Sequence, residues 1–260
     1  MYDRRLPAAF FLGVDKPLGC TSRDVVNRVR SRLEAATGWR GGGGEKRRKK
    51  RLAVGHAGTL DPCASGVLPV AVGRATKFVR FLPQDCKVYA STFALGLSTT
   101  TDDAAGETIG RRDFSWVTEA RANGVLQSRF VGRVEQVPPT VSARHIDGKR
   151  QHKLARSGDL DPSRLRPTTH DVSRIEVMAF RGDQPQPQLD VTVECGSGFY
   201  IRSLARDLGL ALLLEKSAGA DNDDVNAAAA ADDDVGNNGP AFLPGAGAVL
   251  KLPRLMSAGF

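Results

Sequence analysis

The segment Gly55-His56-Ala57-Gly58-Thr59-Leu60-Asp61-Pro62 places a single carboxylate in a turn flanked by glycines. The residues after it, Cys63 to Val70, run into an apolar segment that is typical of a buried strand. Small residues around Asp61 leave room for a large molecule to approach, and the strand would fix the carboxylate at the end of an element. On this segment alone, a simple turn cap remains an alternative role for an Asp-Pro pair.

The composition of the 260-residue chain is that of a basic globular protein. Its hydrophobic content of 41% allows a sizeable core, in one large domain or in two ordinary ones. The net charge is +8 and the isoelectric point is about 9.6. Six aspartates gather between residues 217 and 239, so the remainder carries a net charge of +14. Such a basic body favours a polyanionic partner, although charge alone also fits an ordinary soluble surface.

Cysteine usage and hydropathy indicate an intracellular protein without a membrane segment. The four cysteines are scattered, form no Cys-x-x-Cys pair and lie at no zinc-ligand spacing, so we expect reduced thiols. No apolar run approaches the roughly 18 residues that span a bilayer. Residues 8–14 are apolar but end at Asp15, which predicts a first buried strand rather than a signal peptide. Whether the compartment is the cytoplasm, a mitochondrion or a plastid stays open.

Hydrophobic periodicity predicts helices and strands that do not alternate regularly. Thr21-Ser22-Arg23-Asp24 has the pattern of a capping box, and apolar residues then follow at helical spacing. The expected helices cover residues 22–35, 75–82, 118–129 and 200–215. Further strands are expected over residues 67–72, 87–96, 133–136, 142–146, 172–180 and 189–195. This mixture predicts an α+β fold with a mixed, mainly antiparallel sheet flanked by helices and loops.

Two segments are expected to stand apart from the folded body. Residues 38–51 combine four consecutive glycines with six consecutive basic residues, which predicts a flexible loop. This loop lies just before Gly55 in the chain, so contact with phosphates is an equal alternative. Residues 217–239 combine five consecutive alanines with Asp, Asn and Gly, which predicts a disordered acidic insertion. A single folded domain would then comprise residues 1–216 and 240–260.

Four separated segments carry further motifs in a fixed order. They are Gly13-Val14-Asp15-Lys16-Pro17-Leu18-Gly19-Cys20-Thr21-Ser22, the Asp61 segment, Lys87-Val88-Tyr89 with Thr101-Asp102-Asp103, and Gly196-Ser197-Gly198-Phe199-Tyr200-Ile201-Arg202. Together they resemble the TruB-type pseudouridine synthases, which isomerise a uridine in the T-loop of tRNA. The resemblance extends from about residue 10 to residue 215. It departs at Val141 and near His152, where the family usually has aromatic residues.

By this resemblance, Asp61 is the catalytic carboxylate of a pseudouridine synthase fold. The reaction breaks the bond from N1 of uracil to C1′ of ribose and rejoins the sugar to C5. An ionised carboxylate can act as the nucleophile, but whether it attacks the sugar or the base stays open. The resemblance makes Tyr89 the residue that stacks on the base and accepts the C5 proton, whereas alternation alone fits a core residue equally well. It makes Arg202 the partner of Asp61, although the rarity of buried arginine by itself favours an exposed charge.

The resemblance also implies residues that bind the RNA. His56 is expected to insert into the T-loop and hold flipped nucleotides out of the stack. Tyr200 is expected to line the same pocket as the catalytic groups. Lys16, Lys149 and Arg150 are expected to contact the RNA backbone rather than to take part in the chemistry.

The function implied by the resemblance is that of a tRNA pseudouridine synthase, an isomerase that acts on uridine 55 in the T-arm of tRNA. No cofactor, metal, membrane or obligatory protein partner is expected, in agreement with the lack of zinc-protease and P-loop motifs. No C-terminal PUA-type RNA-binding domain is expected either. Two alternatives stay open, namely a guide-RNA-dependent pseudouridine synthase of the same superfamily and a non-catalytic chaperone that folds tRNA.

Overall fold

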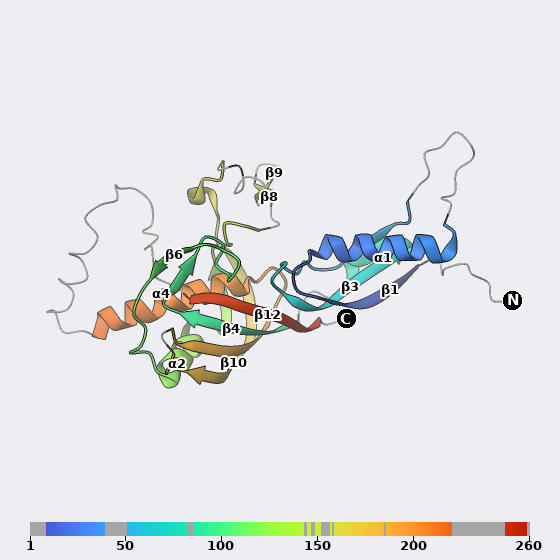
Figure 1. Ribbon diagram of the computed structural model, residues 1–260. Helices are drawn as coiled ribbons and strands as arrows, with labels where there is room; N and C mark the ends of the chain where they lie inside the picture. Colours follow the sequence, from blue (N-terminus) through green and yellow to red (C-terminus); the bar gives the residue numbers. More distant parts are fainter. Residues whose placement is uncertain are drawn as a thin grey trace. The chain divides into compact units, whose positions relative to one another are not determined.

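The computed structural model of the chain (Figure 1) is described for most of its length, in two compact units. The described residues are 9–39, 51–82, 86–142, 145–146, 149–151, 157, 159–184, 186–219 and 248–258. Unit 1 comprises Met1–Tyr89 with Pro253–Phe260, and unit 2 comprises Ala90–Leu252. Strands β4 (Lys87–Leu95) and β12 (Ala248–Ala258) contribute residues to both units.

Unit 1 is a small sheet covered by one helix. The antiparallel strands β1 (Ala9–Lys16) and β3 (Ser65–Gly73) pair along their full length. The short strand β2 (Val54–His56) also pairs with β3 in the antiparallel direction, whereas the end of β12 pairs with β3 in parallel. Helix α1 (Ser22–Thr37) lies along these strands (Figure 1). The sheet of this unit is therefore mixed.

Helix α1 begins where the sequence pattern predicts. Thr21 is the N-cap, its side chain accepts a hydrogen bond from the amide of Asp24, and the Asp24 carboxylate accepts one from the amide of Thr21. These reciprocal bonds satisfy backbone donors that the first helical turn would otherwise leave unpaired. The helix ends at Thr37, two residues beyond the predicted end, and Gly38 caps it in the left-handed conformation.

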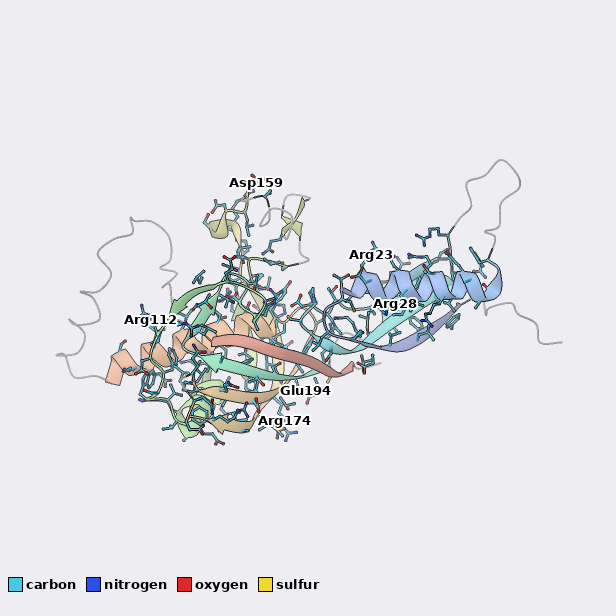
Figure 2. The ribbon with its side chains drawn as sticks, in the orientation of Figure 1. Arg23, Arg28, Arg112, Asp159, Arg174 and Glu194 are labelled. Atoms are coloured by element: carbon cyan, nitrogen blue, oxygen red, sulfur yellow. The ribbon has the colours of Figure 1, made fainter. Side chains whose placement is uncertain are left out.

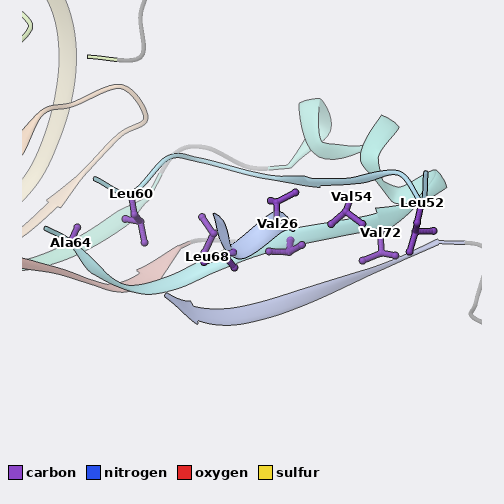
Figure 3. Close-up of a cluster of buried hydrophobic side chains, with 9 residues drawn as sticks. Val26, Leu52, Val54, Leu60, Ala64, Leu68 and Val72 are labelled. Atoms are coloured by element: carbon purple, nitrogen blue, oxygen red, sulfur yellow. The ribbon is translucent and has the colours of Figure 1, made fainter. Parts of the chain in front are cut away.

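The core of unit 1 lies between α1 and the sheet (Figure 3). Val25 and Val26 of the helix pack there with apolar residues of β2, β3 and the loop that joins these strands. Leu60 and Ala64, which lie on either side of Asp61 in the sequence, are members of this cluster and are almost fully buried. The core therefore holds the loop around Asp61 from within.

Unit 2 contains a second antiparallel group of strands. Strand β4 is followed in hydrogen-bonding order by β11 (Gln188–Cys195), β10 (Thr168–Arg181) and β7 (Gly132–Gln136). Helix α2 (Glu119–Arg129) packs on β10 and on helix α4 (Ile201–Gly219). Two small antiparallel pairs accompany them, β5 (Leu97–Thr99) with β6 (Thr108–Arg111) and β8 (His145–Ile146) with β9 (Lys149–Arg150).

These elements confirm the predicted α+β class with a mixed, mainly antiparallel sheet. The helix expected over residues 75–82 is wrong, because the structure has two 3₁₀ turns there, η1 (Arg74–Lys77) and η2 (Val79–Phe81). Leu82 is extended, as expected for a residue that precedes a proline, and this leaves too few residues for an α-helix. The strand expected over residues 142–146 is described only at His145–Ile146.

Most of the two segments predicted to be flexible lies outside the described residues. Within the first, only Gly38, Trp39 and Arg51 are described, and Gly38 caps α1. Within the second, residues 217–219 form the end of α4. The four cysteines are described and are thiols.

Candidate active site

The loop that carries Asp61 is fixed at both ends by strand β3. Strand β2 ends at His56, which is paired with Val70, and the amide of the next residue donates to the carbonyl of Pro69 at 2.9 Å. After the loop, the carbonyl of Asp61 accepts a hydrogen bond from the amide of Ala64 at 3.0 Å. This bond closes a turn whose second residue is Pro62, a position that suits the fixed φ of proline.

Two residues from the start of α1 and the turn before it hold the residues next to Asp61. The hydroxyl of Ser22, in the first turn of α1, donates to the carbonyl of Leu60 at 3.1 Å and accepts from its amide at 3.0 Å. The amide of Gly19 donates to the carbonyl of Pro62 at 2.9 Å. The backbone on either side of Asp61 is thus fixed, while the side chain of Asp61 is partly exposed.

Lys16 is a structural part of this loop, which corrects its predicted role as an RNA-backbone contact. Its side chain is fully buried, and Nζ donates to the carbonyls of Pro17 at 3.0 Å and Cys20 at 2.7 Å. Burial lowers the pKa of Lys16, and the nearby thiols and the Asp61 carboxylate act in the opposite direction. A buried ammonium whose donors bind backbone carbonyls cannot reach a phosphate at the surface.

His56 and Lys87 both border the Gly58 turn. The Nδ1–H of His56 donates to the carbonyl of Gly58, which fixes the ring and leaves Nε2 on the opposite side. Gly58 has a φ of 76°, and a Cβ built on it would stand 3.7 Å from Nζ of Lys87. The Lys87 ammonium therefore lies over the loop, a position that the sequence reasoning did not assign to it.

Tyr89 packs against the core of unit 1. It is half-buried and packs against the apolar cluster that contains Leu60 and Ala64. The next residues on its face of β4, Ser91, Phe93 and Leu95, are buried. Both interpretations of Tyr89 thus fit: part of the ring is core, and part remains accessible.

Arg202 lies in unit 2, in the first turn of α4, and is 4% exposed. Its Nη1 donates to the carbonyl of Thr101 at 3.1 Å and its Nη2 to the carbonyl of Val141 at 3.0 Å. Its Nε lies 3.9 Å from a carboxylate oxygen of Asp103, which is also buried. The alternative of an exposed surface charge is therefore wrong.

A second arginine of α4 binds the neighbouring aspartates. Arg206 lies 3.1 Å from Asp102 and 2.9 Å from Asp207. Burial raises the pKa of both carboxyl groups, and the Arg206 guanidinium opposes this shift. Neither sequence spacing nor the resemblance assigned a role to Arg206.

Tyr200, just before α4, is held by its backbone. The side chain of Gln136 accepts from the amide of Tyr200 at 3.0 Å and donates to its carbonyl at 3.2 Å. Gln136 is buried at the end of β7, so this double contact fixes where α4 begins. Lys149 and Arg150 form strand β9, which pairs with β8.

The predicted site residues are thus grouped in two sets. His56 and Asp61 belong to one loop region of unit 1, Tyr89 packs against the core of the same unit, and Lys16 supports the loop. Arg202 and Tyr200 are held together at the start of α4 in unit 2. The ion pair between Asp61 and Arg202 stays a prediction.

Exposed basic side chains are available on unit 1. Arg23, Arg28 and Arg32 are exposed along α1, and the first two are labelled in Figure 2. Three more exposed basic residues, Arg74, Lys77 and Arg80, lie on η1 and η2, and the exposed Phe78 and Phe81 are next to them in the sequence. Such a surface suits a polyanion.

The described part of the chain lacks two kinds of feature. No helix there is long and apolar enough to cross a membrane. No group of three or more His, Cys, Asp or Glu side chains there has an arrangement that could hold a metal ion.

Comparison with protein families gives a match to the TruB family pseudouridylate synthase (N terminal domain) over residues 46–201. Three curated relatives are each called tRNA pseudouridine synthase B. The protein from Trichormus variabilis is 45% identical over 200 residues, that from Rhodococcus jostii 45% over 208, and that from Corynebacterium diphtheriae 42% over 199. These alignments cover 76%, 80% and 75% of this chain and 61%, 62% and 60% of the relatives. The chain thus spans less than two thirds of the length of these relatives.

Solved structures share the fold. The structure of a Cbf5–Nop10–Gar1 complex contains a chain that matches with a TM-score of 0.56 at 25% identity. The structure of an H/ACA RNP bound to a substrate RNA containing 2′-deoxyuridine gives a TM-score of 0.53 at 24% identity. Each match covers 96% of this chain, and the two matches cover 48% and 47% of the chains in those structures.

Proposed function

Because the chain belongs to the TruB family of pseudouridylate synthases, we propose that it converts uridine 55 in the T-loop of tRNA to pseudouridine. The observation that carries this proposal is the Asp61 loop. One stretch distant in the sequence binds this loop, with Ser22 on the backbone of Leu60 and Gly19 on that of Pro62, while the carboxylate between them stays partly exposed. A reactive group needs such fixed positioning together with access for the substrate.

Asp61 is the proposed nucleophile. An aspartate is ionised near neutral pH and can form a covalent intermediate with a sugar carbon or with the base. The intermediate lets the bond from N1 to C1′ break before the bond from C5 to C1′ forms. The Lys16 ammonium is close enough to Asp61 to interact with it electrostatically.

Tyr89 is the proposed stacking residue and the acceptor of the C5 proton. In support, Tyr89 packs against the apolar cluster to which Leu60 and Ala64 of the Asp61 loop also belong, and half-burial limits the number of conformations it can adopt. Stacking of a base on an aromatic ring is worth about 1–3 kcal/mol, which helps to hold a base that has been detached from its sugar.

Arg202 is the proposed partner of Asp61. A guanidinium that is bound to two carbonyl oxygens has a defined orientation and stays charged in a buried environment. An ion pair with Asp61 would orient the carboxylate and keep it ionised once the substrate excludes water. Tyr200 is proposed to line the same pocket, because Gln136 fixes its backbone two residues before Arg202.

RNA binding is proposed to use His56 and the basic surface. His56 stands at the end of β2 with its ring held by Gly58, so it can act as a wedge that fills the space of a flipped nucleotide. Lys149 and Arg150 are proposed to contact the RNA backbone. The exposed arginines of α1 add attraction that does not depend on sequence.

The direct test is an assay of the purified chain on an unmodified tRNA transcript, with no other protein or RNA present. Pseudouridine is mapped at every uridine, and a transcript with cytidine at position 55 serves as the control. The proposal expects product at position 55 and none in the control transcript. Product at another uridine, or binding and release of tRNA with every uridine unchanged, would reject it; the second result is that of a folding chaperone.

A guide-RNA-dependent activity is a second candidate, favoured by the likeness to the H/ACA RNP structure. The 45% identity to enzymes called tRNA pseudouridine synthase B favours the first candidate. The same assay separates the two, because turnover on a bare transcript excludes a requirement for guide RNA. Turnover that begins only when a guide RNA and its protein partners are added would support the second candidate.

A further inference from the structure

Helix α4 carries two arginines one helical turn apart, the buried Arg202 and the half-buried Arg206, and the proposed function uses only the first. The second, Arg206, forms three hydrogen bonds with three different groups. Its Nη1 donates to Asp102 at 3.1 Å, its Nη2 to the carbonyl of Val137 at 2.8 Å, and its Nε to Asp207 at 2.9 Å. A surface arginine rarely has all three of its nitrogens engaged, which points to a dedicated position.

Both arginines bind the same two segments of the chain. Arg202 binds residues 101–103 through the Thr101 carbonyl and Asp103, and it binds residues 137–141 through the carbonyl of Val141. Arg206 binds the first segment at Asp102 and the second at Val137. Arg206 therefore fixes the two backbone segments whose carbonyls accept hydrogen bonds from Arg202.

The conformation of Asp102 makes this link specific. Its φ is 57°, and it is the single non-glycine residue with positive φ in the described part of the chain. This angle sets the orientation of the peptide unit between Thr101 and Asp102, which contains the carbonyl that Arg202 binds. Left-handed backbone is unfavourable for residues other than glycine, and the ion pair with Arg206 holds Asp102 in it.

We propose that Arg206 and Asp102 form a positioning pair that sets the guanidinium of Arg202 for the isomerisation reaction. This inference rests on the proposed function. Neither residue is proposed to contact the substrate. Both act through the Thr101 carbonyl and the Val137–Val141 segment, so their loss displaces Arg202 without removing it.

The test compares Arg206→Lys and Asp102→Asn with the wild-type chain and with Arg174→Lys as a control. Arg174 is an exposed arginine of β10, and lysine keeps its charge. Lysine at position 206 keeps the charge but cannot make three divergent hydrogen bonds, and asparagine tolerates positive φ without carrying a charge. Each variant is assayed in a single turnover on a tRNA transcript with enzyme in excess, and its Kd for the same transcript is measured.

The expected result is a single-turnover rate about tenfold to a hundredfold lower in both variants, with Kd within about twofold of the wild type. The double variant should be no slower than the slower single variant, because the two residues act as one unit. Arg174→Lys should match the wild type. A separate spectroscopic readout is the ¹⁵N–¹H resonance of Arg202 Nε, which should move in both variants and stay in the control.

Several outcomes would overturn the inference. One is a lower melting temperature with an unchanged single-turnover rate, which means that the pair has only a structural role. Another is an unmoved Arg202 resonance together with a reduced rate. If the wild-type chain makes no pseudouridine, the proposed function fails and this inference fails with it. If the wild type is active and Arg206→Lys is equally active, only this inference fails.

Discussion

The hydroxyl of Ser22 makes two hydrogen bonds with the backbone of Leu60, one to its carbonyl at 3.1 Å and one from its amide at 3.0 Å. Thirty-eight positions separate these residues in the sequence, and both are buried. The first turn of α1 thereby holds the residue that precedes Asp61. A side chain outside the loop therefore controls where the proposed nucleophile stands.

Replacing Ser22 with alanine is expected to lower both stability and activity. The buried amide and carbonyl of Leu60 lose their partner, which costs about 1–3 kcal/mol in the free energy of unfolding. The loop also relaxes, so the single-turnover rate on tRNA should fall at a temperature where the chain remains folded. Urea unfolding and the rate assay measure the two effects. Ser31→Ala, at an exposed position of the same helix, should change neither.

Lys16→Met is expected to destabilise the chain without changing the electrostatic part of tRNA binding. The ammonium bonds to Pro17 and Cys20 are lost, and their carbonyls are left without this donor. Lys16 makes no phosphate contact, so the slope of log K for tRNA against log salt should equal that of the wild type. The comparison variant is Arg28→Gln, which removes a charge from the exposed face of α1 and retains Lys16. A shallower slope for Lys16→Met would restore its assignment as a phosphate contact.

Two glycine-to-alanine changes are expected to have opposite effects on stability. Gly96 has a φ of 75°, and a Cβ there would stand 2.3 Å from the carbonyl oxygen of Arg112. Alanine at this position should lower the free energy of unfolding by more than about 2 kcal/mol. Gly124 lies within α2, and no atom lies within 4 Å of a Cβ built on it. Alanine there should raise the free energy of unfolding by about 1 kcal/mol. Thermal unfolding of both variants measures the two effects. Equal shifts in melting temperature would contradict the described backbone.

The ion pair of Asp190 predicts a stability difference that depends on pH. Arg181 donates to both carboxylate oxygens at 2.7 Å and Thr92 donates at 2.6 Å, so these hydrogen bonds lower the pKa of Asp190 below its ordinary value of 3.8. The unfolded chain then takes up the proton first as pH falls. The stabilisation is present above 3.8 and is lost as pH falls through the lowered pKa of the folded state.

Asp190→Asn should therefore be less stable than the wild type at neutral pH, by about 1 kcal/mol at most because the pair is partly exposed. This difference in the free energy of unfolding should disappear as pH falls below 3.8. Urea unfolding at several pH values measures it. Asp171→Asn, an exposed aspartate of β10, should follow the wild type throughout. A gap that widens in acid would show that the sign of the pKa shift is wrong.

Sequence patterns predicted best where the determining interactions are local. The capping box at Thr21 depends on residues within one helical turn, and helix α1 begins there as expected. The helix expected over residues 75–82 failed because Leu82 precedes a proline and is extended. Strand β2 was missed because it has three residues and its central one is a glycine, which is uncommon in strands.

Side-chain roles that depend on distant partners could not be predicted in the same way. The resemblance implied a contact with the RNA backbone for Lys16, and only the fold shows that its side chain is buried among carbonyl groups. The spacing of Arg206 from Arg202 is the signal that was available for the second arginine, since four residues place both on one side of α4. Its partners, Asp102 and Val137, lie far away in the sequence.

The most direct test of the central claim is the Asp61→Asn variant, assayed on an unmodified tRNA transcript beside the wild type and Asp183→Asn, an exposed aspartate. The amide keeps the size of the side chain but is a far weaker nucleophile, so binding should persist while pseudouridine at position 55 disappears. The control should form product at the wild-type rate. Pseudouridine formation by Asp61→Asn at that same rate would contradict the assignment of Asp61 as the catalytic residue.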